Sequence, residues 1–242
     1  MQHYFTPPPD SGGMVSITGQ DALHLARVLR VRAGGHVTVT DGMGGRWKTE
    51  IVSASTELVE ARVVAVLPAP PEPAVGVTLF VARSKADKWE HVLQKAVELG
   101  AVRLTPFSSS RCVGVFSEAR LPRLRGIARE AAMQSGRGVV PTVDKPVSYA
   151  EAVGRAAGCE LALFCYEEAR ELSLRMALSG RTPRSVAILT GPEGGFSHEE
   201  AAYAKQAGCL PVSLGPRILR CETAPLAALT MTLALLGEME PQ

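Results

Sequence analysis

Two glycine-bearing stretches near the end of the sequence combine turn residues with charge. They are residues 188–197, ILTGPEGGFS, and residues 214–225, LGPRILRCETAP. Four charged side chains lie inside them: Glu193, Arg217, Arg220 and Glu222. A plain turn needs no such set of charges, so the pattern favours a polar ligand, although two tight turns that end buried strands remain the alternative.

Each stretch lies between an apolar strand and a helix. The predicted strands are residues 186–189 and 210–214, because both are short apolar runs followed by glycine. Ser197 is a suitable N-cap for the first helix, and Thr223 is a candidate N-cap for the second, with Pro225 in its first turn. Glycine loops at strand ends are typical places for a ligand bound by backbone groups.

Several common chemistries leave no trace in the sequence. Neither phosphate-binding pattern, GxxxxGK[ST] or GxGxxG, occurs. The five histidines are scattered at positions 3, 24, 36, 91 and 198, so no metal-ligand cluster is expected. Ser-His-Asp chemistry has no nucleophile elbow to support it.

The two stretches resemble the RsmE family of ribosomal RNA methyltransferases, which belong to the SPOUT superfamily. The resemblance is carried by LTGPEGGFS and LGPRILRCETA, and it extends over residues 24–225. It implies methylation of uracil N3 in the 16S rRNA of the small ribosomal subunit, with S-adenosylmethionine as cofactor, S-adenosylhomocysteine as product and no metal. It also implies a homodimer, a deep C-terminal trefoil knot and the assembled small subunit as substrate.

The same resemblance assigns roles within the two stretches. The cofactor would contact backbone groups of Leu189, Thr190, Gly191, Gly194, Leu214, Gly215, Ile218 and Leu219, with Thr223 and Ala224 completing the site. Because the cofactor's sulfonium is already a potent electrophile, the protein mainly supplies positioning and electrostatics.

Uracil N3 carries a proton and is a poor nucleophile until that proton is lost. We expect Arg220 to stabilise the negative charge that develops on the base. Glu222 or Glu193 would hold Arg220 or accept a hydrogen bond. The identity of the proton acceptor stays open, and none is needed above neutral pH.

The first 67 residues are predicted to form a small β-rich domain. Strands are expected at 15–17, 36–40, 46–53 and 57–67, with a helix at 21–30. Lys and Arg outnumber acids between residues 22 and 48, which favours an RNA-facing surface over an ordinary solvated helix face. His24, Arg27 and Arg30 lie in HLARVLR, which resembles the family's PUA-like RNA-binding barrel.

Four prolines in residues 68–73 predict a stiff linker, so the second domain would run from 75 to 242. Its strands and helices alternate, which indicates an α/β fold with a mostly parallel sheet of the SPOUT type. Helices are expected at 86–99, 119–135, 149–157 and 168–178. Strands are expected at 75–82, 102–106 and 160–165.

Basic and polar residues of this half extend the predicted RNA site. The candidates are Arg83, Lys85, Lys88, Arg111, Gln134 and Arg137, and an ordinary solvated surface is the alternative. Met133 stands where the family usually has glutamate. We expect Glu130, one turn back on nearly the same helix face, to supply that carboxylate.

Composition sets outer limits. The chain has 242 residues, a net charge of +2 and five cysteines without a CxxC pair, so a cytoplasmic protein without disulfides or zinc is expected. The N-terminus lacks the pattern of an export signal. The apolar run 224–236 is too short to span a bilayer and fits a buried helix or a subunit interface.

Two other functions fit parts of the pattern. Another SPOUT enzyme, acting on ribose 2′-O or on a tRNA base, would share the fold but match the two stretches less well. A non-catalytic RNA-binding or ribosome-assembly factor would keep the basic surfaces and lose the cofactor pocket.

Overall fold

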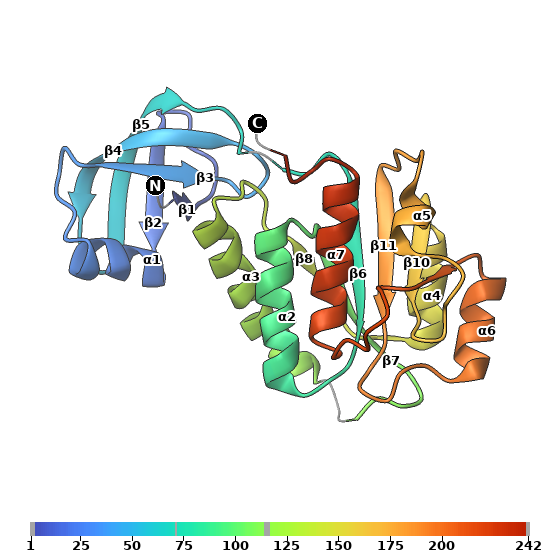
Figure 1. Ribbon diagram of the computed structural model, residues 1–242. Coiled ribbons are helices and arrows are strands. Elements are labelled where there is room, and N and C mark those ends of the chain that lie inside the picture. Colours follow the sequence, from blue (N-terminus) through green and yellow to red (C-terminus); the bar gives the residue numbers. More distant parts are fainter. Residues whose placement is uncertain (1–2, 71, 114–116, 241–242) are drawn as a thin grey trace. The chain divides into compact units, whose positions relative to one another are not determined.

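The computed structural model describes residues 3–70, 72–113 and 117–240 (Figure 1). The chain divides into two compact units, residues 1–72 with 132–140 and residues 73–131 with 141–242. Residues 132–140 therefore return to the first unit, which a linear division at 67 and 75 does not include. The functional domain boundaries stay a prediction.

A five-stranded sheet in the order β1-β3-β4-β5-β2 forms the first unit. The strands are β1 (His3–Phe5), β2 (Met14–Thr18), β3 (His36–Thr40), β4 (Arg46–Ala54) and β5 (Leu58–Val66). All neighbours pair antiparallel except β1 and β3, which pair parallel. The sequence analysis missed β1, whose three residues are all buried but are too few to show a period.

The predicted helix at 21–30 lies two residues earlier in the chain and is less regular than expected. It consists of α1 (Gly19–Leu23) followed by a π-helical turn at His24–Val28. Arg30 then has φ 50°, in the left-handed region that non-glycine residues seldom occupy. Single π-turns inside helices are frequent at functional sites.

Glu72 fixes the end of the linker within the first unit. Its carboxylate accepts hydrogen bonds from Arg137 Nη2 at 2.6 Å and from the backbone N–H groups of Gly138 and Val139. The Arg137 side chain is only 6% exposed. Charge-assisted bonds of this kind to a buried guanidinium hold the linker against the returning segment.

A parallel sheet in the order β12-β10-β11-β6-β7-β8, with β9 beside β7, forms the second unit. The strands are β6 (Gly76–Ala82), β7 (Arg103–Ser108), β8 (Thr142–Val143), β9 (Val147–Ser148), β10 (Leu161–Cys165), β11 (Ser185–Thr190) and β12 (Leu210–Val212). The predicted α/β fold with a parallel sheet is confirmed. The two-residue strands β8 and β9 were not predicted, because they carry too little pattern.

Helices cover this sheet on both faces. They are α2 (Ala86–Leu99), α3 (Leu121–Ser135), α4 (Tyr149–Ala157), α5 (Leu174–Leu178), α6 (His198–Gln206) and α7 (Thr223–Leu235). On one face α7 packs against α2 and α5, and on the other α4 packs against β10 and β11 (Figure 1). None of the described helices is both long and apolar enough to cross a membrane.

The predicted helix 168–178 is wrong in its first half. Ser213 N–H donates to Leu172 O and Leu174 N–H donates to Ser213 O, so the backbone around Ser173 is held extended beside the strand β12 segment. The Ser173 hydroxyl then accepts from Met176 N–H and caps the short α5. A tertiary backbone pairing has overridden the local helical pattern.

Candidate active site

The ends of three parallel strands meet at the candidate site. Cys165 of β10 pairs with Thr190 of β11 and with Val212 of β12, so the segments that follow these strands leave the sheet side by side. Together with Lys88 of α2 they line a cavity of about 610 Å³. This is the carboxyl edge at which α/β sheets usually bind ligands.

Most of the predicted cofactor residues lie in this cavity. Those that line it are Thr190, Gly191, Gly194, Leu214, Gly215, Ile218, Leu219 and Ala224. Two predicted residues do not: Leu189 is fully buried in the core, and Thr223 faces solvent. Thr223 is also the first helical residue of α7 rather than its N-cap, which is Glu222, so that capping prediction was wrong by one residue.

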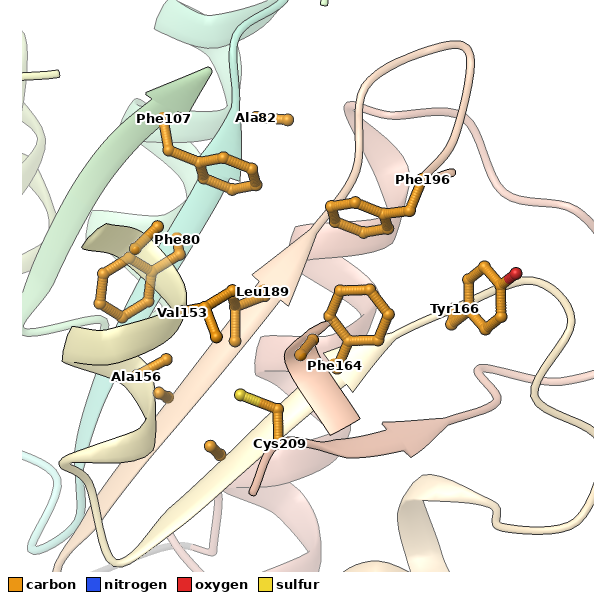
Figure 2. Close-up of a cluster of buried hydrophobic side chains, with 14 of the residues drawn as sticks. Phe80, Ala82, Phe107, Val153, Ala156, Phe164, Tyr166, Leu189, Phe196 and Cys209 are labelled. Atoms are coloured by element: carbon orange, nitrogen blue, oxygen red, sulfur yellow. The ribbon is translucent and has the colours of Figure 1, made fainter. Parts of the chain in front are cut away.

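The first loop, residues 191–196, is held by the aromatic core beneath it. Phe196 is 3% exposed and its ring centroid lies 4.4 Å from that of Phe164 and 6.3 Å from that of Phe107, in a stacked arrangement with the latter (Figure 2). A Cβ on Gly191 would lie 3.0 Å from the Phe196 ring. The glycine therefore lets the backbone approach the ring closely.

Gly195 and Arg111 fix the far side of the same loop. Gly195 has φ +66°, and a Cβ there would overlap the Glu167 carboxylate. Arg111 Nη1 donates to Gly194 O at 3.0 Å and to Phe196 O at 3.2 Å. The structure thus places Arg111, a predicted RNA contact, as a support of the loop.

The middle of the second loop, residues 213–222, is exposed. Ile218 is 90% exposed although it is apolar, and Arg217 and Arg220 are exposed as well. Thr223 N–H and Ala224 N–H both donate to Arg220 O, which places Arg220 directly before α7. Within the described residues neither arginine side chain has a hydrogen-bonding or ionic partner.

Lys88 connects the two loops. Its Nζ lies 3.3 Å from Glu193 Oε1 and 3.3 Å from Glu222 Oε2. Cys221 Sγ lies 3.8 Å from the same ammonium group and donates to Glu222 Oε2 at 3.1 Å. Lys88, Glu193, Glu222 and Cys221 are called the Lys88 cluster below.

Proton affinities in the Lys88 cluster follow from these contacts. The bond to Glu222 is the main reason that the pKa of Lys88 is raised. The Cys221 thiol, its own backbone N–H and Lys88 lower the pKa of Glu222. Burial pushes the pKa of Glu193 up, but hydrogen bonds to its own backbone N–H, Lys88 and Cys221 bring it below its ordinary value. Burial, then Glu222, raises the pKa of Cys221 to about 12.

These contacts differ from the expected pairing. The sequence analysis predicted that Glu222 or Glu193 would hold Arg220 or accept a hydrogen bond. In the structure both carboxylates pair with Lys88, Cys221 donates a hydrogen bond to Glu222, and no described residue pairs with Arg220. Lys88 is far from both carboxylates in the sequence, but α2 places its side chain between the two loops, where it contacts both. At pH 7 the carboxylates and Lys88 are ionised and Cys221 is a neutral thiol.

The cavity also carries groups suited to a polar ligand of cofactor size. Thr190 is 1% exposed, and its Oγ1 has no hydrogen-bond partner among the described residues. A buried hydroxyl without a partner is costly unless a ligand or water satisfies it. The glycine loops add backbone N–H and C=O groups. No cluster of His, Cys, Asp and Glu able to hold a metal is present in the described part of the chain.

Three of the remaining predicted RNA contacts are exposed residues of the first unit. Arg27 and Arg30 lie at the π-helical turn, and Gln134 lies near the end of α3. His24 is half-buried, and its Nδ1 lies 3.1 Å from Tyr4 Oη. Arg137 does not reach the surface, because Glu72 holds it buried.

In the second unit, Lys85 is exposed, Arg83 is half-buried and the Glu130 carboxylate is exposed on α3. Met133, where the family usually has glutamate, packs against the apolar core of the first unit. Arg103, Arg120 and Arg123 form ion pairs with Asp144 or Glu90, which reduces the arginine surface available for phosphates.

Sequence reasoning missed the third side of the cavity. Cys165 at the end of β10 lines it, together with Tyr166 and Glu167 directly after the strand. Tyr166 Oη donates to Glu168 Oε2 at 2.9 Å, and burial raises the pKa of Tyr166 to about 12. The signal was present, since polar residues follow an apolar strand there, but the expected helix at 168–178 obscured it.

Comparison with known proteins agrees with this geometry. Residues 70–233 match the family described as RNA methyltransferase domain, and residues 17–64 match the RNA methyltransferase PUA domain. The ribosomal RNA small subunit methyltransferase E of Synechocystis is 35% identical over 227 residues, 92% of this chain and 73% of that protein. The protein of that name from Bacillus subtilis is 33% identical over 89% of this chain and 88% of its own length.

A solved structure extends the likeness to three dimensions. The ribosomal RNA small subunit methyltransferase E of Neisseria gonorrhoeae, determined with bound S-adenosyl methionine, is 33% identical and superposes with a TM-score of 0.88 over 97% of this chain and 98% of that one. The predicted resemblance is confirmed, and this chain belongs to the ribosomal RNA small subunit methyltransferase E family.

Proposed function

We propose that this protein transfers the methyl group of S-adenosylmethionine to N3 of a uridine in the 16S rRNA of the small ribosomal subunit. The observation that carries the proposal is the cavity at the ends of β10, β11 and β12. It combines glycine loops and the orphaned Thr190 hydroxyl with the exposed Arg220 and with Glu193, which Lys88 holds. The cofactor seen in the Neisseria gonorrhoeae relative supports the choice of ligand.

When bound, the cofactor supplies an electrophilic methyl group on a sulfonium. Backbone groups of Thr190, Gly191 and Gly215 would hold it, and the Thr190 hydroxyl would gain a hydrogen-bond partner. Arg220 would donate to the uracil as negative charge develops beside N3. Its guanidinium is suited to this role because no carboxylate among the described residues neutralises it.

The proton acceptor for N3 stays unassigned. Glu193 and Glu222 have lowered pKa values and are therefore ionised but weak bases. Because these carboxylates are weak bases, the alternative is that N3 loses its proton to solvent above neutral pH. The five free cysteines fit a reaction in the reducing cytoplasm.

The expected trefoil knot and homodimer belong to the same proposal. After the edge strand β12, the chain returns to pack α7 against β11 and β6 in the middle of the sheet, and this return supports the proposed knot. The outer side of α7 exposes Ala234 and 42% of Leu235, an apolar surface suited to a partner subunit. Light scattering in solution tests the dimer, and a monomer at micromolar concentration would contradict it.

The decisive experiment transfers labelled methyl from S-adenosylmethionine to small subunits from cells that lack this protein. Nucleoside analysis of the product should give 3-methyluridine, in subunits in preference to naked rRNA. Arg220→Ala should bind cofactor normally and lose most turnover, whereas Arg155→Ala, a distant surface control, should not. Methylation of another atom would contradict the N3 assignment, and near-normal turnover of Arg220→Ala would contradict its role.

A further inference from the structure

Lys88 stands apart from the other predicted RNA contacts because its charge is directed inward. It is the third residue of α2, and its side chain is 30% exposed. The carboxylates that it contacts come from two loops that are distant in sequence, and they are 34% and 20% exposed. A phosphate contact would leave the ammonium group facing solvent, which is not the geometry observed.

The two contacts of Lys88 differ in what they constrain. Glu193 lies in the middle of the loop after β11, where Phe196 and Arg111 hold the distal half. Glu222 is the residue from which α7 begins. One ammonium group therefore joins a loop to the start of a helix, and both segments line the same cavity.

We propose that Lys88 is a positioning residue that couples the two cofactor loops by holding Glu193 and Glu222 together, and that it does not contact RNA. Without the ammonium group, two carboxylates at the same place repel each other and separate the loops. The neighbouring Arg220 then becomes an available partner for them, which would withdraw it from the substrate. This inference rests on the proposed function for its effect on catalysis, but not for its effect on the loops.

Electrostatic considerations favour one bridging lysine over two separate pairs. Each exposed ion pair alone contributes little. Lys88 takes part in both pairs, so loss of its contact with Glu193 weakens its contact with Glu222, and the reverse. The three charges sum to −1, and the neutral Cys221 thiol supplies a further donor to Glu222 without adding charge. The arrangement holds the loops together without neutralising the cavity.

The test compares Lys88→Met with Lys95→Met in the intact protein. Methionine keeps the length of the stem and removes the charge. Lys95 lies on the same helix and makes a single local ion pair with Glu98. Hydrogen–deuterium exchange without cofactor should show amides of both 191–196 and 213–222 exchanging roughly threefold to tenfold faster in Lys88→Met only. Unchanged exchange in either loop would overturn the proposal.

Binding measurements separate the proposed role from an RNA contact. Affinity for S-adenosylmethionine should fall roughly threefold to tenfold in Lys88→Met, with Lys88→Arg partly restoring it. Adding Glu193→Gln and Glu222→Gln to Lys88→Met should cause little further loss, because the three groups act as a unit. A loss of RNA affinity with unchanged cofactor affinity would overturn the proposal in favour of the predicted RNA contact.

The outcome for the proposed function is read separately. If wild-type protein transfers no methyl group to small subunits, the proposed function fails, while the exchange comparison still decides whether Lys88 couples the loops. If methyl transfer proceeds, the turnover of Lys88→Met should be closer to the wild-type value at saturating cofactor than at low cofactor. A defect that saturating cofactor leaves untouched would contradict a role in cofactor positioning.

Discussion

Replacing Phe196 with alanine should destabilise the second unit and loosen the first cofactor loop. The side chain is 3% exposed, and its ring lies near those of Phe107 and Phe164, with centroids at 6.3 and 4.4 Å (Figure 2). The centroid of the Tyr149 ring lies 5.8 Å from it. Truncating a buried phenylalanine typically costs about 3–5 kcal/mol. Phe196 lies on a loop that can partly collapse into the space, so we expect about 3 kcal/mol.

The two tryptophans allow that loss to be assigned to one unit. Trp47 belongs to the first unit, and Trp89, which is 2% exposed, belongs to the second. In a Trp47→Phe background, urea unfolding followed by fluorescence therefore reports on the second unit alone. The free energy of unfolding of Phe196→Ala should be lower by about 3 kcal/mol, and that of Phe196→Leu by about 1 kcal/mol.

A matched control and a second readout make the reasoning refutable. Tyr203 is an aromatic residue of similar size that is 45% exposed, so Tyr203→Ala should cost about 1 kcal/mol or less. Phe196→Leu should remain folded and bind S-adenosylmethionine more weakly than wild type. A loss below about 1 kcal/mol for Phe196→Ala would show that the loop does not depend on this ring. Unchanged cofactor affinity in Phe196→Leu would show that the core does not position the site.

Three further predictions concern the same loops. Arg111→Ala removes the donor to Gly194 O and Phe196 O, so cofactor affinity measured by calorimetry should fall severalfold. Salt-sensitive RNA binding should change little. Weaker RNA binding with unchanged cofactor affinity would instead support the predicted RNA contact. Gly195→Ala should lower both stability and cofactor affinity, because its φ of +66° disfavours a side chain and the new Cβ meets Glu167; wild-type values for both would contradict this. The pKa values of Glu193 and Glu222 lie below the ordinary 4.5, so their contribution to stability is complete above that pH and is lost as pH falls through the lower folded values. Cofactor affinity should therefore stay constant from alkaline pH down to about pH 5 and decline only below it, and a transition near neutral pH would contradict the assignment.

Elements with a clear hydrophobic period were predictable from the sequence. The helix Ala86–Leu99 has the predicted bounds, and Trp89, Val92 and Leu93 on its apolar stripe are all buried. Ser197 caps α6 in a complete capping box with Glu200, as its position before two acidic residues indicated. Local rules sufficed here because the interactions span only a few residues.

Elements that depend on distant partners were not predictable in the same way. The start of α5 is delayed by backbone pairing of Leu172 and Leu174 with Ser213, about forty residues later in the chain. The short strand β1 exists because β3 offers it a parallel partner. Nothing within either segment signals these contacts, since the deciding hydrogen bonds involve residues far away in sequence.

The candidate site shows the same limit for charges. The types and spacing of Glu193, Arg220 and Glu222 predicted a polar site at the strand ends, where Glu193 and Arg220 line the cavity and Glu222 pairs with Lys88. They did not indicate which charges pair, because Lys88 is 105 residues from Glu193 and enters only through the fold. Residue type and spacing therefore located the cavity, whereas its electrostatics required three-dimensional positions.

That pairing explains why one short loop carries charges of both signs. The cofactor proposed for this cavity is a cation at its sulfonium, whereas the proposed substrate is a polyanion. Glu222 pairs with Lys88, while Arg217 and Arg220 are exposed and have no partner among the described residues. If Lys88 were absent, Arg220, two residues before Glu222, would be available to pair with these carboxylates, and its charge would be neutralised. Keeping the acids paired with Lys88 and the arginines unpaired allows neighbouring residues to serve two ligands of opposite charge, and it depends on a lysine from another helix.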